Sequence, residues 1–178
     1  MTKTMRVGEI LLTEEQIKSK VAELAEQINR DYAGKDLIVV GILKGCFVFV
    51  SDLVRHLDGD VQVHFMQVSS YGSGTESTGQ LQIKKDLSVD IAGKHVLIAE
   101  DIVDSGNTLV KLLPMLEERK PASIQVCALL SKPSRRQVEY DPDYIGFEIP
   151  DKFIVGYGLD CDERFRQLPY IGVVEIED

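Results

Sequence analysis

Three carboxylates and a small polar loop lie within residues 96–108, and their order points to a binding site. A short apolar run over residues 96–99 predicts a buried parallel strand. Glu100 and Asp101 follow this run directly, and Asp104 comes shortly after them. A carboxylate at the end of a buried strand carries a desolvation cost unless it has a partner. The acid pair is therefore a candidate ligand-binding feature.

The loop that follows is suited to a phosphate group. It consists of Ser105, Gly106, Asn107 and Thr108, and a helical pattern begins at Leu109. The first N–H groups of a helix have no intrahelical partner and lie at the positive end of the helix dipole. Glycine allows close approach of an anion to the backbone, and the two hydroxyls add donors. We therefore expect this loop to bind a phosphate monoester.

The acid pair must bind something else, because carboxylates repel a phosphate. Glu100 and Asp101 suit the hydroxyls of a ribose, either directly or through a hard cation such as Mg²⁺. A phosphate at one end and a diol at the other describe a ribose 5-phosphate. The competing explanation is an ordinary helix cap made by Asp104 or Ser105. That explanation leaves Glu100 and Asp101 unaccounted for.

Strand-like and helix-like segments alternate along the first three quarters of the chain. This alternation predicts an α/β fold in which a central, mainly parallel twisted sheet is flanked by helices. Such sheets bind ligands beyond the carboxyl ends of their strands. Lys44-Gly45, residues 100–108 and Ser131-Lys132 all fall at such ends. The predicted helices cover about 13–32, 46–57 and 107–118, and the predicted strands cover about 37–43, 61–68, 81–84, 96–99 and 123–130.

A chain of 178 residues fits a single domain, 1–178. Its last part has short strand-like pieces and no long helical pattern. We expect a core over about 11–132 and a small C-terminal subdomain over about 133–178, which we call the hood. Residues 1–10 are a candidate addition to it.

The composition of the chain limits its possible binding partners and its cellular compartment. A net charge of −9 argues against nucleic-acid binding, and no apolar run has the length of a membrane span. The N-terminus has no secretory h-region. Cys46, Cys127 and Cys161 lack metal-ligand spacing, which favours free thiols in the cytoplasm. An anionic ligand would need local positive potential from helix N-termini, Lys44, Arg166 and Mg²⁺.

The stretch from Glu100 to Thr108 resembles the phosphoribosyl-pyrophosphate (PRPP) signature of type I phosphoribosyltransferases, in particular their hypoxanthine-guanine branch. The resemblance covers nearly the whole chain. Further matching segments are Leu43-Lys44-Gly45, Ser69-Ser70-Tyr71-Gly72, Leu129-Leu130-Ser131-Lys132-Pro133, and Ile149-Pro150-Asp151-Lys152-Phe153 through Asp160 and Arg166.

The resemblance implies the type I phosphoribosyltransferase fold and a purine-salvage activity. The 5-phosphoribosyl group would pass from PRPP to N9 of hypoxanthine or guanine, giving IMP or GMP and pyrophosphate. Mg²⁺ would be the cofactor, and the protein would form a homodimer or homotetramer. A PRPP-sensing regulator is an alternative, but the chain has no basic stripe and no fused binding module. A dinucleotide enzyme using Gly41–Gly45 would lack the usual glycine fingerprint.

The resemblance also assigns residues to the two ends of PRPP. Its ribose and 5′-phosphate would contact Glu100, Asp101, Asp104, Ser105, Gly106, Asn107 and Thr108. Its pyrophosphate would contact Lys44, Gly45, Arg166, Ser70 and Tyr71, with residues 69–79 acting as a lid and the Leu43–Lys44 peptide bond in the cis form. A lid is expected because water would capture an oxocarbenium-like sugar.

Contacts to the purine and to the metal complete the implied site. Asp104 would exchange a proton with the purine N7, and Lys132 would donate to O6, which favours a 6-oxopurine over adenine. Phe153 would stack on the purine, and the Ile154 backbone would contact its edge. Asp160 would lie on the purine side as a second metal-linked carboxylate. The implied metal-linked residues are Glu100, Asp101 and Asp160.

Overall fold

The central feature of the computed structural model is a six-stranded sheet, and the structure describes residues 4–70 and 80–177, with the backbone alone for Ser70. The strands run in the order β4-β3-β2-β5-β6-β7, and all neighbours are parallel except β3 and β4. This confirms the predicted α/β class with a mainly parallel sheet. The strands are β2 (Leu37–Leu43), β3 (Val61–Ser70), β4 (Leu81–Lys85), β5 (His95–Val103), β6 (Ser123–Ser131) and β7 (Tyr144–Glu148).

The order of the strands reverses between β2 and β5. From β2 the chain moves to β3 and β4 on one side, and then returns to place β5, β6 and β7 on the other side. The carboxyl ends of β2 and β5 therefore diverge into loops that turn in opposite directions, which opens a crevice at this switch point. The fold thus predicts a ligand site between the ends of these two strands.

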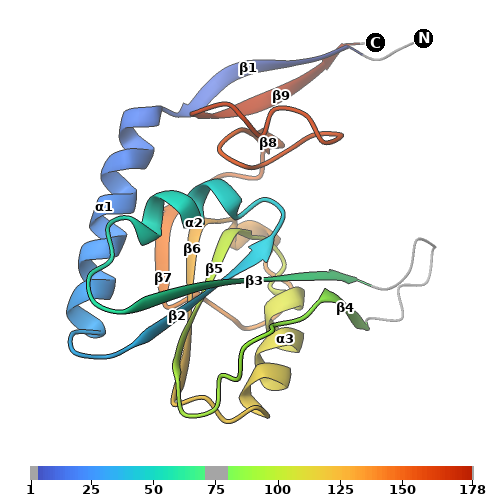
Figure 1. Cartoon of the computed structure of the whole chain (residues 1–178). Helices are drawn as coiled ribbons and strands as arrows, with labels where there is room; N and C mark the ends of the chain where they lie inside the picture. Colours follow the sequence, from blue (N-terminus) through green and yellow to red (C-terminus); the bar gives the residue numbers. More distant parts are fainter. Residues whose placement is uncertain (1–3, 71–79, 178) are drawn as a thin grey trace.

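Helices cover both faces of the sheet (Figure 1). α1 (Glu14–Asp31) and α2 (Phe47–Val54) pack on one face with Val39, while α3 (Asn107–Glu117) packs on the other with Val40. The two strand residues are neighbours in sequence, so their side chains point to opposite faces, which explains the continuous apolar pattern of β2.

The predicted helix boundaries are mostly close to the observed ones. α1 begins after Thr13, and the predicted capping box is present, with Gln16 N–H donating to Thr13 Oγ1 at 3.2 Å. α2 is shorter than predicted, because the chain leaves the helix after Val54 through turns closed by the His56 and Leu57 N–H groups.

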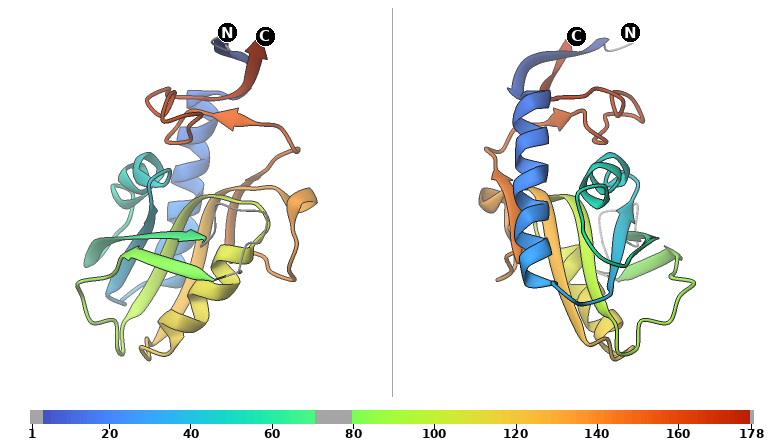
Figure 2. Two further views of the ribbon diagram at one scale, coloured as in Figure 1. Left: turned by 90° about the vertical axis from the view of Figure 1, so that its right-hand side faces the viewer. Right: turned by 60° about the vertical axis from the view of Figure 1, so that its left-hand side comes forward.

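A second, three-stranded sheet forms the hood. Its order is β1-β9-β8, from β1 (Thr4–Leu12), β8 (Ile154–Val155) and β9 (Ile171–Glu177), so the N-terminal segment joins the C-terminal one. In both views of Figure 2, this sheet lies above one end of the central sheet. β7 is not part of the hood sheet, because β7 pairs with β6 in parallel register. The expected boundary at residue 133 therefore assigned β7, a strand of the central sheet, to the hood.

Among the residues that the structure describes, no helix combines the length and the apolar character needed to cross a membrane.

Candidate active site

A cavity of about 390 Å³ lies at the switch point between β2 and β5. Eight of the residues predicted for the site line it, and they come from the turn after β2, from β5, from the turn before α3 and from the first turn of α3. They are Lys44, Gly45, Glu100, Asp101, Asp104, Ser105, Gly106 and Thr108. The sheet thus brings together segments that are more than fifty residues apart in the sequence.

The acid pair lies within β5 and not beyond its end. Pairing with β6 continues through Glu100 and as far as Val103, so the strand is longer than the apolar run predicted. Successive strand residues face opposite sides of a sheet. Glu100 and Asp101 therefore point to different faces, yet both line the cavity.

Burial makes both acids unusual. Burial, and then the charge of Asp101, raises the pKa of Glu100 well above its ordinary value. Burial likewise raises the pKa of Asp101 to about 6, although the Ile102 N–H donates to its Oδ1 at 2.7 Å. Two neighbouring carboxylates in a low-dielectric site resist simultaneous ionisation, and a cation or a set of hydroxyl donors would relieve that cost.

The donor set fits a magnesium ion that also uses ligand oxygens. Among the residues of 4–70 and 80–177, no group of three or more His, Cys, Asp or Glu side chains could hold a metal by itself. Mg²⁺ characteristically takes one or two carboxylates and completes its shell with water and substrate oxygens. Glu100 and Asp101 match that role, and Asp160 lies in a separate loop.

Replacing Glu100 by Gln is expected to stabilise the free protein. The pKa of Glu100 is higher in the folded state than in the unfolded state. Between these two pKa values, the folded state keeps a proton that the unfolded state has released. The contribution of Glu100 to the free energy of unfolding is therefore full at low pH and is lost as pH rises through the folded pKa. At pH 7 in chelator we expect Tm to rise by about 2–4 °C, as roughly 1 kcal/mol gives in a domain of this size.

The matched control is Glu139→Gln, which removes the same charge from an exposed position. Its Tm should stay within about 1 °C of the parent, as is usual for a surface change. Differential scanning calorimetry between pH 4 and pH 8 makes the measurement, and the gain in Glu100→Gln should disappear toward pH 4. A Glu100→Gln variant less stable than the parent at pH 7 would contradict the assigned burial cost.

The turn before α3 has the conformation expected of an anion site. Gly106 has φ +81°, in the left-handed region, and a Cβ at this position would lie 2.9 Å from Val138 Cγ2. The first intrahelical bond runs from the Val110 N–H to the Gly106 carbonyl at 3.1 Å, so the N–H groups before Val110 have no intrahelical acceptor. Asn107 differs from the others, because its side chain donates to Gln137 Oε1 at 2.7 Å and does not line the cavity.

Asp104 and Lys132 form a pair across the ends of β5 and β6. Lys132 Nζ lies 4.0 Å from Asp104 Oδ1. Lys132 is 7% exposed, although its position just past a strand would suit an exposed lysine equally well. The backbone N–H of Lys132 donates to the Val103 carbonyl at 3.0 Å. This bond fixes Lys132 beside the turn before α3, which we call the phosphate turn. A buried donor and a carboxylate are thus held side by side.

Arg136 supports this pair, although no sequence pattern distinguishes it. Its Nη1 donates to the Asp104 carbonyl at 2.6 Å, and its Nη2 donates to Ser131 Oγ at 2.9 Å. One guanidinium, on a side chain that is only 12% exposed, thereby joins the loop that carries Asp104 to the residue before Lys132. In sequence it is one of two adjacent arginines in a polar stretch, so only its three-dimensional contacts distinguish it.

The turn after β2 lies tightly between β5 and the hood. The Leu43–Lys44 peptide bond is cis, as predicted. A Cβ on Gly45 would lie 1.8 Å from Asp101 Oδ2, and a Cβ on Gly158 would lie 2.2 Å from the Gly45 carbonyl oxygen. A side chain at Gly45 would therefore displace the Asp101 carboxylate, and one at Gly158 would force the two backbones apart. Gly158 was not predicted, because its role depends on this contact between distant segments.

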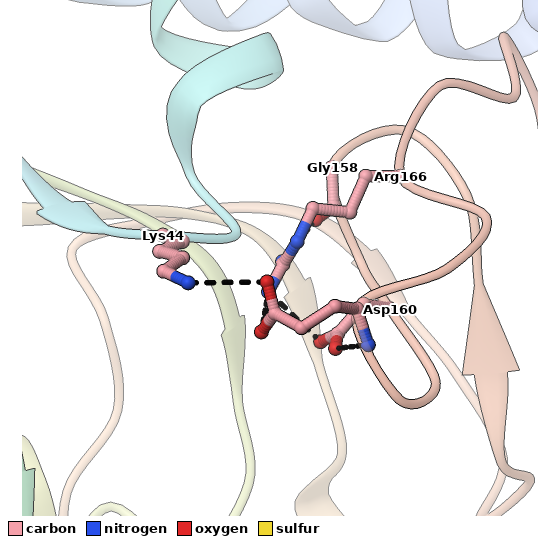
Figure 3. A network of polar contacts seen from close by, with 5 residues as sticks. Lys44, Gly158, Asp160 and Arg166 are labelled. Atoms are coloured by element: carbon pink, nitrogen blue, oxygen red, sulfur yellow. Dashed lines mark hydrogen bonds and ion pairs between the residues drawn. The ribbon is translucent and has the colours of Figure 1, made fainter.

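Arg166 and Asp160 lie in the loop between β8 and β9, which we call the hood loop and which faces Lys44 (Figure 3). Arg166 Nη1 donates to the Gly158 carbonyl at 2.7 Å, and its Nη2 lies 3.3 Å from Asp160 Oδ1. Glu163 links Arg166 to Lys44, with 3.1 Å from the carboxylate to each cation. The structure thus brings together Lys44 and Arg166, the two basic side chains predicted to bind pyrophosphate. The residue that links them, Glu163, was not predicted from the sequence.

The remaining predicted residues lie away from the cavity lining. Ile154 is buried in β8 opposite Val173, whereas Phe153 is 55% exposed although its side chain is large and apolar. An exposed aromatic ring is suited to stacking. Tyr71 and most of the predicted lid, 69–79, lie outside the described residues, as does the side chain of Ser70.

A phosphate-suited turn and a buried acid pair at the switch point of a doubly wound sheet define a candidate phosphosugar-binding α/β protein. The family model for the phosphoribosyl transferase domain matches residues 8–162, and the chain belongs to this family.

Similar proteins support the same assignment. The chain is 50% identical over 172 residues to the hypoxanthine phosphoribosyltransferase of Escherichia coli K12, covering 96% of this chain and 97% of the relative. It is 50% identical over 169 residues to the hypoxanthine-guanine phosphoribosyltransferase of Staphylococcus aureus Mu50, covering 95% and 94%. A crystal structure of a Bacillus anthracis hypoxanthine-guanine phosphoribosyltransferase superposes with a TM-score of 0.91 at 45% identity, covering 97% of this chain and 100% of that one.

Proposed function

We propose that the protein is a purine-salvage phosphoribosyltransferase. It transfers the 5-phosphoribosyl group of PRPP to N9 of hypoxanthine or guanine and releases pyrophosphate with IMP or GMP. The observation that carries this proposal is that the acid pair of β5 and the turn before α3 line the same cavity. Relatives that match nearly the full chain are named as hypoxanthine or hypoxanthine-guanine phosphoribosyltransferases, which supports the same reaction.

PRPP is held at three points in this proposal. The N–H groups and hydroxyls of residues 105–108 bind the 5′-phosphate at the N-terminus of α3. Glu100 and Asp101 hold the ribose hydroxyls. Lys44, Gly45 and Arg166 bind the pyrophosphate, and Ser70 and Tyr71 close over it. Fixing both ends of PRPP orients C1 toward the incoming base, which is a large part of the catalytic effect.

The base is oriented by the pair at the ends of β5 and β6. Lys132 donates to O6, and Phe153 stacks on the purine while the Ile154 backbone contacts its edge. As N9 forms its bond to C1, the purine becomes more acidic, and Asp104 accepts the proton from N7. The bond from C1 to the pyrophosphate oxygen breaks, and both bonding electrons leave with pyrophosphate.

A magnesium ion fits this arrangement through Glu100 and Asp101, with Asp160 on the purine side. When bound, it neutralises negative charge on the departing pyrophosphate. The need for it follows from the charge balance, since a protein of net charge −9 must bind a polyanion. We place the enzyme in the cytoplasm, in keeping with three cysteines that are all free. A homodimer or homotetramer stays a prediction.

A steady-state assay tests the function directly. PRPP, Mg²⁺ and one of hypoxanthine, guanine, xanthine or adenine are supplied, and nucleotide and pyrophosphate are measured. We expect equal amounts of nucleotide and pyrophosphate with hypoxanthine or guanine and little product with adenine. PRPP binding without turnover of any purine would instead favour a PRPP-sensing protein.

A further inference from the structure

One carboxylate lies between the two cations that we assign to pyrophosphate. Lys44 Nζ donates to Glu163 Oε2 at 3.1 Å, and Arg166 Nη2 donates to Glu163 Oε1 at 3.1 Å. Each carboxylate oxygen therefore takes a different cation. A phosphate group bound in this place would use its oxygens in the same way.

The backbone around Glu163 holds its side chain in this position. Asp162 and Glu163 have φ of +53° and +61°, a conformation that few residues other than glycine adopt. The Glu163 N–H donates to Asp160 Oδ2 at 2.9 Å, which closes the turn. Arg166 is fixed as well, since its side chain is 18% exposed and bonded to the Gly158 carbonyl. Figure 3 shows Lys44 reaching toward this loop from the turn before α2.

The charges are consistent with a true ion bridge. Hydrogen bonds from Lys44 and then from Arg166 lower the pKa of Glu163, so the group is ionised at neutral pH. Its side chain is 65% exposed and that of Lys44 is 56% exposed, so neither is locked in place by packing. The bridge can therefore open without disturbing the core.

We propose that Glu163 is an internal counter-anion of the leaving-group site. It occupies Lys44 and Arg166 while the site is free, and it gives them up when pyrophosphate binds. Pyrophosphate must displace a carboxylate and then lies close to its charge, so Glu163 lowers pyrophosphate affinity and assists product release. This inference rests on the proposed function, because it takes Lys44 and Arg166 as pyrophosphate contacts.

Binding of pyrophosphate to the whole protein, without turnover, tests this proposal. Isothermal titration calorimetry with magnesium pyrophosphate is run on the parent and on Glu163→Gln, which keeps the shape and removes the charge. We expect Glu163→Gln to bind pyrophosphate about three- to fivefold more tightly, within the range that an exposed ion pair supports. Glu163→Asn, whose side chain tolerates left-handed backbone, should change affinity in the same direction.

Asp162→Asn is the matched control. It removes the same charge from the neighbouring position of the same turn, where the described residues give Asp162 no ion pair or side-chain hydrogen bond. Its affinity for pyrophosphate should stay within about twofold of the parent, as expected for a screened surface charge. In the forward reaction, product inhibition by pyrophosphate should strengthen in Glu163→Gln by the same factor as its binding, with KM for hypoxanthine unchanged.

Two results would overturn the inference. Unchanged or weaker pyrophosphate binding in Glu163→Gln would show that Glu163 does not compete for the cations, and an equal gain in Asp162→Asn would reduce the effect to general charge. Failure of the proposed function looks different, because the parent itself would then neither bind pyrophosphate nor transfer phosphoribose.

Discussion

Replacement of Asp104 by Asn is expected to lower kcat by about 10²–10³-fold, within the range that a positioned acid–base group supplies. Asparagine keeps the size of the side chain but cannot accept the N7 proton. The backbone contact from Arg136 to the Asp104 carbonyl should persist, since it does not involve the side chain. The phosphate turn is thereby retained, so KM for PRPP should change by less than about threefold.

Asp141→Asn is the appropriate control for this variant. Asp141 also lies near Arg136, with 3.5 Å between carboxylate and guanidinium, but its side chain is 81% exposed. The same charge is removed from the same neighbourhood, and kcat should be close to that of the parent. Steady-state kinetics with hypoxanthine and PRPP decide the matter. A near-normal kcat in Asp104→Asn would remove Asp104 from proton transfer.

The second large effect concerns the choice of base. Lys132 is buried and offers donors only, so it pairs with a purine O6 and leaves the amino group of adenine without an acceptor. Replacing it by Gln should lower kcat/KM for hypoxanthine by about 10²–10³-fold, because a charged donor to a buried oxygen is lost. Glutamine can present its carbonyl to an amino group, so the preference for hypoxanthine over adenine should narrow by a similar factor.

Lys152→Gln provides the comparison for the base-selectivity test. Lys152 precedes Phe153 and is paired with Glu9 at 2.9 Å on the surface, so the same change there should leave base selectivity intact. The ratio of kcat/KM for hypoxanthine to that for adenine is measured in both variants, with circular dichroism as the check on folding. An unchanged ratio in Lys132→Gln would assign base recognition to another group.

Much of the fold was predictable because its signals are local. The apolar pattern of β2 and the capping box at Thr13 depend on neighbouring residues, and both were correct. The extent of β5 was not predictable in the same way. Glu100 and Asp101 end the apolar run, but pairing with β6 continues to Val103, since backbone pairing does not require apolar side chains. β7 was assigned to the hood and not to the central sheet, because the sequence of a short strand does not show which strand it pairs with.

In the candidate site, too, local features were predictable and long-range contacts were not. The phosphate turn and acid pair are contiguous in sequence, and the structure places them on one cavity. Arg136, Gly158 and Glu163 depend on contacts between segments that are far apart in the chain. Gly158, for example, is required only where the hood loop meets the Gly45 carbonyl. Such residues cannot be found from composition or spacing, because what marks them is a contact and not a pattern.

The most direct test is a crystal structure of the protein with IMP and Mg²⁺. The account predicts the 5′-phosphate within about 3 Å of the N–H groups and hydroxyls of residues 105–108, the distance of a hydrogen bond. The ribose hydroxyls should lie beside Glu100 and Asp101, directly or across the metal. A phosphate bound elsewhere, with nothing against the turn before α3 and both acids facing away from the nucleotide, would contradict it.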